Sequence, residues 1–338
     1  MRPCQEFTHG RTKDDTMTGK GLALIAVGGN SLITDNARVS VENQYEAIQK
    51  TVRHVADVIE AGRQVVFTHG NGPQVGFIMR RSEIARKVAG MHPVPMASCV
   101  ADTQGAIGWQ IQQALTNELM RRTVSAKNRD KAVTVVTQVL VDPADPAFSD
   151  PNKFVGEFFH DADLPTLKKD FPHWVIKQDA DRGWRRVVPS PKPQAIVELD
   201  AIRSLLNDGF NVVAVGGGGI PVVMDDKGEL HGVAAVVDKD LASRLLATEL
   251  KAELFVISTA VKQVSINFGK PGRQDLGTVT AGEMRGYDAQ GHFPAGSMQP
   301  KVHAALDFLD KGGREVVITT PDNLKDALMH NGGTHIVP

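Results

Sequence analysis

The 338-residue chain carries 38 lysines and arginines against 39 aspartates and glutamates, so its formal net charge is −1. This near balance gives no electrostatic footprint for nucleic acid or an anionic membrane surface. With 41% hydrophobic residues, the chain has enough apolar material for a large core, which excludes an intrinsically disordered protein. Its two cysteines, Cys4 and Cys99, are too few for a disulfide framework and indicate a reducing cytoplasm.

No apolar segment approaches the roughly 20 residues that a membrane-spanning helix needs. Residues 1–20 are polar and lack the apolar centre of a secretory signal, so we expect a flexible tail there, with Met17 as an alternative start.

The predicted elements alternate between strands and helices. Residues 22–27 form an apolar run that ends in glycine, which is typical of a buried strand in a parallel sheet. Between 41 and 59, apolar residues recur at steps of three and four, which predicts an amphipathic helix. The same reasoning predicts a strand at 65–67, a helix at 107–119 and a strand at 132–141.

The alternation stops between residues 142 and 193, where prolines are frequent and two of the three tryptophans, Trp174 and Trp184, are found. Proline at this density excludes long helices and central strands, so we expect a small inserted subdomain at about 142–192. Beyond it the sequence predicts helices at 196–205, 238–250 and 302–309, and strands at 211–215, 254–257 and 316–318.

Strands that alternate with helices predict an α/β fold whose mostly parallel sheet is covered on both faces. Ligands bind such sheets at the carboxyl ends of the strands, where glycine lets the backbone turn its N–H groups toward an anion. One glycine turn alone could be an ordinary corner, but three at strand ends predict a phosphate-bearing ligand. The predicted phosphate-binding residues are Gly28, Gly29, Asn30, Gly70, Asn71, Gly72, Gly216, Gly217 and Gly218.

Two common nucleotide motifs are absent. No Gly-Lys pair has the context of a P-loop, G-x-x-x-x-G-K-[ST]. The dinucleotide fingerprint G-x-G-x-x-G fails at its third glycine, which is Val75 in one turn and Pro221 in another. An oxidoreductase therefore loses most of its support.

Six separated segments together closely resemble carbamate kinase, a branch of the amino acid kinase family. They are residues 28–30, 68–76, 216–222, 237–243, 266–271 and 296–302, in the family's order, and the inserted stretch is similar at 142–148, 153 and 182–191. The resemblance extends over about residues 21–338. It implies reversible phosphoryl transfer between ATP and carbamate, which gives ADP and carbamoyl phosphate.

The resemblance also implies an architecture: a three-layer αβα sandwich with a small inserted subdomain, assembled as a homodimer. The N-terminal lobe (21–225) would hold carbamate or carbamoyl phosphate, and the C-terminal lobe (226–338) would hold ATP or ADP with Mg²⁺. The nucleotide-binding residues implied are Ser258, Ala260, Ser265, Met298 and Lys301.

The physics of this reaction calls for cations rather than a general base. Carbamate is already an anion, and two unit charges about 4 Å apart repel by roughly 4 kcal/mol at an effective dielectric constant of about 20. Such a site should contain cations, N–H donors and Mg²⁺. By resemblance, the catalytic residues are Lys153, Lys239 and Lys301, with Asp240 holding the lysines in position.

One pair of positions favours this branch over its relatives. Many amino acid kinases carry a lysine two residues before the first glycine pair, where this chain has Ala26. Carbamate kinases also lack that lysine, and their inserted subdomain brings another one over the site, where this chain has Lys153.

Ordinary structural roles stay open for several residues. A lysine is usually a solvated surface charge, and Asp240 could be a helix N-cap or first-turn carboxylate. His69 could simply hydrogen-bond its own turn, and the chemistry needs no base. An anion clamp and a brace for the insertion are equally compatible with three arginines: Arg182, Arg185 and Arg186.

Five positions depart from the family pattern: Ser31, Phe154, Asp181, Ser265 and His335. They leave open a paralogue that phosphorylates another small carboxylate or carbamate. A third possibility is a catalytically silent nucleotide-binding regulator on the same fold, against which the intact Lys239, Asp240 and Lys301 count.

Overall fold

The computed structural model describes residues 21–28, 32, 40–122, 130–172, 174–179, 183–294 and 297–338. The predicted tail at 1–20 lies outside these ranges. So do five individual residues discussed above: Gly29, Asn30, Ser31, Asp181 and Arg182.

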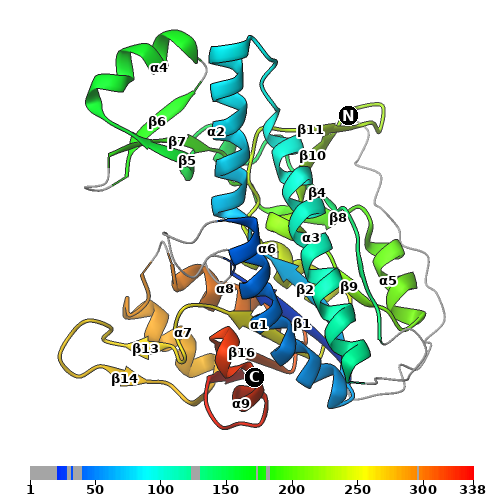
Figure 1. The fold of residues 1–338 in the computed structure, drawn as a ribbon. Coiled ribbons are helices and arrows are strands. Elements are labelled where there is room, and N and C mark those ends of the chain that lie inside the picture. Colours follow the sequence, from blue (N-terminus) through cyan, green and yellow to red (C-terminus); the bar gives the residue numbers. More distant parts are fainter. Residues whose placement is uncertain are drawn as a thin grey trace.

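An eight-stranded sheet of order β15-β17-β16-β12-β1-β2-β9-β3 forms the centre of the molecule (Figure 1). Its strands are β1 (Leu22–Val27), β2 (Gln64–His69), β3 (Ala132–Thr134), β9 (Asn211–Val213), β12 (Leu254–Ser258), β15 (Thr278–Thr280), β16 (Glu315–Thr319) and β17 (Thr334–Val337). Neighbouring strands run parallel except β16 and β17. The predicted mostly parallel sheet is confirmed.

Helices cover both faces of this sheet. Side chains of a strand point alternately to opposite faces, and in β1 Leu22 and Leu24 pack into one core while Ala23 and Ile25 pack into the other. Helices α5 (Leu199–Asn207), α6 (Lys239–Glu249), α7 (Ala281–Ala289) and α8 (Gln299–Asp310) contribute to the first core. Helices α1 (Val41–Glu60), α3 (Met96–Arg121) and α9 (Leu324–Leu328) contribute to the second.

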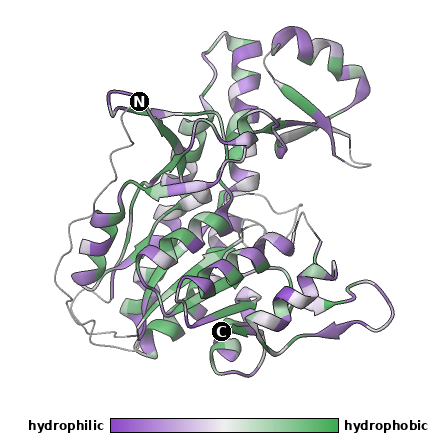
Figure 2. Ribbon diagram, turned by 180° about the vertical axis from the view of Figure 1, so that it is seen from behind, coloured by the Kyte–Doolittle hydropathy of each residue, from purple (hydrophilic) through white to green (hydrophobic). Residues whose placement is uncertain are grey.

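The three layers explain why the buried strands read as continuous apolar runs. The central strands form a hydrophobic layer between amphipathic helices (Figure 2), because a sheet covered on both faces has no face left for polar side chains. No helix in the described ranges is long and apolar enough to cross a membrane.

The predicted strand at 132–141 is wrong in one respect, because the chain changes sheets within it. Residues 132–134 belong to the main sheet, whereas β4 (Gln138–Val141) belongs to a four-stranded sheet of order β11-β10-β4-β8. At the break, the side chain of Gln104 accepts from the backbone N–H of Thr137 at 2.7 Å and donates to its carbonyl at 3.0 Å. A helix side chain therefore binds both backbone groups of Thr137 where the chain passes between the sheets, and the carbonyl also accepts from the Ile220 N–H at 2.9 Å.

The other strands of this second sheet are β8 (Pro193–Ile196), β10 (Ile220–Met224) and β11 (Leu230–Gly232). The predicted helix at 196–205 is therefore also wrong at its start: Ile196 ends β8, and α5 begins only at Leu199.

Between β4 and β8 lies a small unit that we call the inserted sheet: β5 (Lys153–Phe159), β6 (Val175–Gln178), β7 (Trp184–Val188) and α4 (Leu164–Asp170). It projects from the body of the molecule beside α2 (Gly72–Ala89) (Figure 1). A short hairpin, β13 (Ser265–Ile266) with β14 (Gln274–Asp275), precedes β15. The division into lobes at 225/226 stays a prediction.

Candidate functional site

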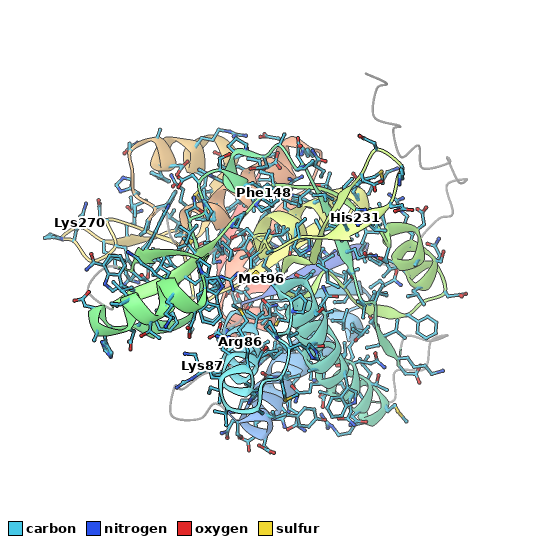
Figure 3. All side chains as sticks on the ribbon, turned by 90° about the horizontal axis from the view of Figure 1, so that it is seen from above. Arg86, Lys87, Met96, Phe148, His231 and Lys270 are labelled. Carbon is cyan, nitrogen blue, oxygen red and sulfur yellow. The ribbon has the colours of Figure 1, made fainter. Side chains whose placement is uncertain are left out.

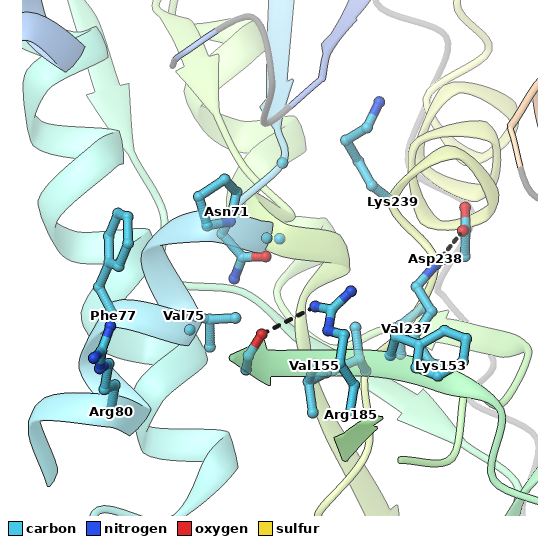
Figure 4. Close-up of a pocket in the computed structure, with 18 of the residues that line it drawn as sticks. Asn71, Val75, Phe77, Arg80, Lys153, Val155, Arg185, Val237, Asp238 and Lys239 are labelled. Carbon is cyan, nitrogen blue, oxygen red and sulfur yellow. Dashed lines mark hydrogen bonds and ion pairs between the residues drawn. The ribbon is translucent and has the colours of Figure 1, made fainter. Parts of the chain in front are cut away.

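An open cavity of about 510 Å³ lies at the carboxyl end of β2, between α2, α6 and the inserted sheet (Figure 4). Its walls come from residues 70–73, 75–77, 80, 153–156, 185, 217 and 236–240. Predicted site residues that line it are Gly70, Asn71, Gly72, Lys153, Gly217, Lys239 and Asp240. Segments far apart in the sequence therefore meet where an open parallel sheet binds its ligands.

Asp240 joins two of the predicted lysines. Its Oδ1 accepts from the Lys239 ammonium at 2.6 Å, and its Oδ2 accepts from the Lys301 ammonium at 2.7 Å. The carboxylate is buried, which alone would raise its pKa, but the charges and hydrogen bonds of Lys239 and Lys301 outweigh burial and hold the pKa well below its usual range. A fixed anion thus orients two cations, one from α6 and one from α8.

Asp238 performs two tasks that the sequence analysis missed. Its Oδ1 caps α6 by accepting from the backbone N–H groups of Asp240 at 2.9 Å and Leu241 at 3.4 Å. Its Oδ2 accepts from the ammonium of Lys153 at 3.0 Å, which brings the first residue of β5 to the start of α6 (Figure 4). An Asp directly before the first helical residues is an N-cap signal, but nothing in the sequence links it to Lys153.

The glycines at 216–218 are required by close packing. Gly217 and Gly218 have positive φ values of 67° and 95°, and a Cβ on Gly218 would lie 2.2 Å from the carbonyl oxygen of Val237. A Cβ on Gly217 would lie 2.2 Å from the Asn71 amide nitrogen. The glycine-rich turn therefore lets the segments around Asn71 and Val237 pack against it beside the cavity. This packing explains why the turn contains glycine, whether or not it binds a ligand.

The N-terminus of α2 opens on the cavity. The Asn71 amide donates to the Thr103 hydroxyl at 2.8 Å and makes no capping bond to the helix. The first N–H groups of α2 therefore lack a side-chain cap, and such a helix end favours an anion. The N-terminus of α6 lies across the same cavity and adds a second helix dipole of the same sense.

His69 has the structural role of a side chain that contacts its own turn. Its Nδ1 lies 3.1 Å from the Gly70 carbonyl oxygen, and its buried ring packs where a Cβ on Gly216 would be only 2.4 Å from Nε2. Burial lowers its pKa to about 4, with the nearby Lys239 charge adding to the effect. The ring is therefore neutral at physiological pH.

Arg185 and Arg186 brace the insertion. Arg185 donates to Asp179 at 3.0 Å and to the Gly156 carbonyl at 3.1 Å, and it also lines the cavity (Figure 4). The Arg186 guanidinium lies 4.5 Å from the centroid of the Trp174 ring. The bracing alternative therefore holds for both, and of these two Arg185 also lines the cavity, as does Arg80 of α2.

The predicted nucleotide residues Ser258, Ala260, Ser265 and Met298 do not line this cavity. Ser258 ends β12 next to Val27, and its buried Oγ has no hydrogen-bond partner in the described part of the chain. Ser265 donates to Asp275 at 2.6 Å. Ala260 is exposed, and Met298 packs at the start of α8 against the core. Of the five predicted nucleotide-binding residues, all of them in the described ranges, Lys301 is the one that hydrogen-bonds to a cavity residue, Asp240.

Two of the departures from the family pattern have clear surroundings. Phe154 lines the cavity. His335, in β17, lies 2.6 Å from Glu315 Oε1 at the amino end of β16, and this hydrogen bond raises the histidine's pKa. The change at 335 therefore lies at the amino ends of the parallel strands, whereas the cavity lies at their carboxyl ends.

Comparison with known proteins identifies a family to which the chain is similar over most of its length. The model of the amino acid kinase family matches residues 21–320. The chain is 51% identical to the carbamate kinase-like protein YahI of Escherichia coli, over 94% of this chain and 99% of that protein. It is 45% identical to the carbamate kinase of Thermococcus kodakarensis, over 93% and 98%. The structure of carbamate kinase from Giardia lamblia bound to AMP-PNP superposes with a TM-score of 0.86 at 38% identity, covering 94% of this chain and 98% of that one.

Proposed function

Because this chain belongs to the amino acid kinase family, we propose that it transfers a phosphoryl group reversibly between ATP and carbamate, giving ADP and carbamoyl phosphate. Its similarity to proteins named carbamate kinase over nearly their full length supports this function. The observation that carries the proposal is the arrangement of Lys239, Asp240 and Lys301 beside a cavity that Lys153 also lines.

The arrangement suits a reaction between two anions. One carboxylate between two ammonium groups leaves one net positive charge, and its buried position keeps the three groups preorganised, so little reorganisation is needed as charge moves in the transition state. Because carbamate needs no deprotonation, the neutral His69 is no obstacle. In the proposed division of labour, Lys239 and Lys301 balance the charge of the phosphoryl group in transit.

The other site residues bind and enclose the substrates. We assign the carbamoyl group to the cavity, where the N-terminus of α2 offers N–H donors and Lys153 closes the inserted-sheet side. The nucleotide extends toward α8 and the end of β12, where the unpartnered Ser258 Oγ is a ready hydrogen-bonding group. Mg²⁺ enters as part of the nucleotide substrate, because the cavity carboxylates Asp238 and Asp240 are already paired with lysines.

We further infer a cytoplasmic homodimer. Helix α3 packs on the edge strand β3, and three large apolar side chains, two in α3 and one just after β3, are more than half exposed: Trp109 (55%), Met120 (60%) and Val136 (51%). A sheet edge with apolar side chains around it suits a second copy of the same chain. The free buried thiol of Cys99 agrees with a reducing compartment.

The direct test is a coupled assay for ATP formation from ADP and carbamoyl phosphate, run beside acetyl phosphate and other acyl phosphates. The proposal expects carbamoyl phosphate to give the highest kcat/KM. Preference for another acyl phosphate would establish that the chain is a paralogue with a different acyl substrate. Two observations favour this alternative: the "carbamate kinase-like" name of the Escherichia coli relative, and Phe154 in the cavity wall. Calorimetric binding of ATP without turnover of any substrate would establish the regulator.

A further inference from the structure

Four side chains connect the inserted sheet to α2, and we call them the arginine–aromatic cluster: Arg86, Phe171, Trp174 and Arg186. The Phe171 and Trp174 rings are stacked, with centroids 4.0 Å apart and planes inclined by 14°. The Arg86 guanidinium lies 4.7 Å from the Phe171 centroid, and that of Arg186 lies 4.5 Å from the Trp174 centroid. Cations over aromatic faces attract more strongly when they are desolvated.

Only one member of the cluster belongs to the body of the molecule. Arg86 is in the last turn of α2, whereas Phe171 follows α4, Trp174 precedes β6 and Arg186 is in β7. In Figure 3 Arg86 lies beside α4, and its Nη2 is 3.7 Å from Asp170 Oδ2. The cluster therefore connects the inserted sheet to α2, and through Arg186, which pairs with Val155, it lies two residues along β5 from Lys153.

The environment of the cluster is closely packed. Phe171 is 8% exposed, and burial lowers the pKa of Arg186 below its usual range. The space between α2 and the inserted sheet, lined in part by Glu83, Trp174 and Arg186, measures about 10 Å³, room for about one water molecule. The Nε and Nη2 atoms of Arg86 are buried without hydrogen-bond partners in the described ranges, so stacking and the Asp170 charge are its compensation.

A second contact, near the base of the inserted sheet, places Lys153. Val155 and Val188 pack with Val75 and Met79 of α2, and a Cβ on Gly76 would lie 3.7 Å from the Gly156 Cα, so β5 runs directly against the helix. The two contacts adjoin, because Val155 pairs with Arg186 across β5 and β7, so the inserted sheet is held to one helix along a continuous contact. We expect loss of the cluster to loosen this contact and to let Lys153 move away from Asp238.

We propose that the arginine–aromatic cluster positions Lys153: by fixing the inserted sheet on α2, it holds the Lys153 ammonium over the cavity. The four residues are positioning residues, since none of them lines the cavity to which the carbamoyl substrate is assigned. This inference rests on the proposed function, because it assumes that Lys153 acts on the carbamoyl substrate.

The experiment compares Trp174→Leu and Arg86→Met with Trp184→Leu in the coupled assay. Trp184→Leu is a matched control, because it removes an indole from the same sheet outside the cluster, where its Nε1 donates to Asp161. We expect the two cluster variants to raise the KM for carbamoyl phosphate about tenfold. ADP affinity and the behaviour of the Trp184→Leu protein should stay close to wild type.

Combination with Lys153→Ala separates positioning from general damage. If the cluster acts through Lys153, adding Trp174→Leu to Lys153→Ala causes no further loss of kcat/KM. Equal losses in both backgrounds, or an unchanged KM in Trp174→Leu, would overturn the inference. A Lys153→Ala protein with wild-type kinetics would instead refute the role that the proposed function gives Lys153.

Amide hydrogen exchange tests the anchoring of the inserted sheet without an activity measurement. The inference expects the amides of β5 to exchange faster in Trp174→Leu than in wild type and Trp184→Leu. Unchanged exchange in β5 would refute it, even if the wild-type protein made no ATP.

Discussion

At the residue scale, Asp240 is the shared counterion of two lysines of the site. Replacing it with Asn leaves the Lys239 and Lys301 ammonium groups without their shared counterion. Breaking a buried ion pair in this way costs about 3 kcal/mol of unfolding free energy, and we expect kcat/KM to fall about 100-fold because the lysines lose their orientation. Denaturant unfolding and steady-state kinetics measure the two effects.

The control for this variant is Asp310→Asn, which breaks the half-exposed pair with Arg285 and should cost less than about 1 kcal/mol. The pKa of Asp240 is lowered, so its contribution is fully present above the unfolded-state pKa of about 4 and is lost only as pH falls below it. Equal stability losses in the two variants, or a loss for Asp240→Asn that varies between pH 5 and 8, would contradict this account.

His69 gives a prediction of pH dependence. Because its pKa is about 4 in the folded protein against 6.5 ordinarily, the unfolded chain binds a proton first as pH falls. The free energy of unfolding should therefore decrease between pH 6.5 and 4 by up to about 3 kcal/mol from this residue. Unfolding curves of wild type and His69→Gln at pH 7.5 and 4.5 test this. Identical pH dependence in the two proteins would show that His69 is not buried in its neutral form.

At the element scale, the glycine-rich turn after β9 can be tested by adding one methyl group. Gly218→Ala places a Cβ against the Val237 carbonyl at a residue with φ of +95°, so we expect destabilisation by more than the roughly 1–2 kcal/mol of left-handed backbone strain. Gly228→Ala is the matched control, because φ is +84° there but no atom lies within 4 Å of the added Cβ. Thermal unfolding of both variants gives the comparison, and equal losses would mean that the close approach does not matter.

The elements also show what the sequence could predict. The buried strands and the helix at 238–250 were predictable, since their apolar patterns and caps are local signals. The division of residues 132–141 between two sheets was not, because it depends on Gln104, a helix residue distant in the sequence that bonds to Thr137. Similarly, Asp238 could be predicted as a helix cap, but its pairing with Lys153 depends on how the inserted sheet docks.

The predicted glycine turns have a mixed outcome. Gly70, Gly72 and Gly217 line the cavity, whereas Gly28, Gly216 and Gly218 do not. Part of their signal has another origin, because Gly216 and Gly218 make room for His69 and Val237. The binding roles of all these glycines stay predictions.

At the scale of the whole molecule, the exposed apolar side chains beside β3 predict the oligomeric state. We expect the wild-type protein to sediment as a dimer and Trp109→Lys to shift it toward monomer, because a buried lysine at an interface is costly. Val88→Lys, which changes an 83%-exposed residue on α2, is the control and should leave the dimer intact. Wild-type sedimentation as a monomer would refute the proposed assembly.

The account as a whole rests on charge: two anions react in a cavity where lysines oriented by Asp240 neutralise them. The most direct measurement is the rate of ATP formation from ADP and carbamoyl phosphate by Lys301→Met, beside Lys311→Met at the exposed end of the same helix. We predict a loss of about 100-fold or more for Lys301→Met and a near wild-type rate for Lys311→Met. A Lys301→Met protein that forms ATP at the wild-type rate would contradict the account.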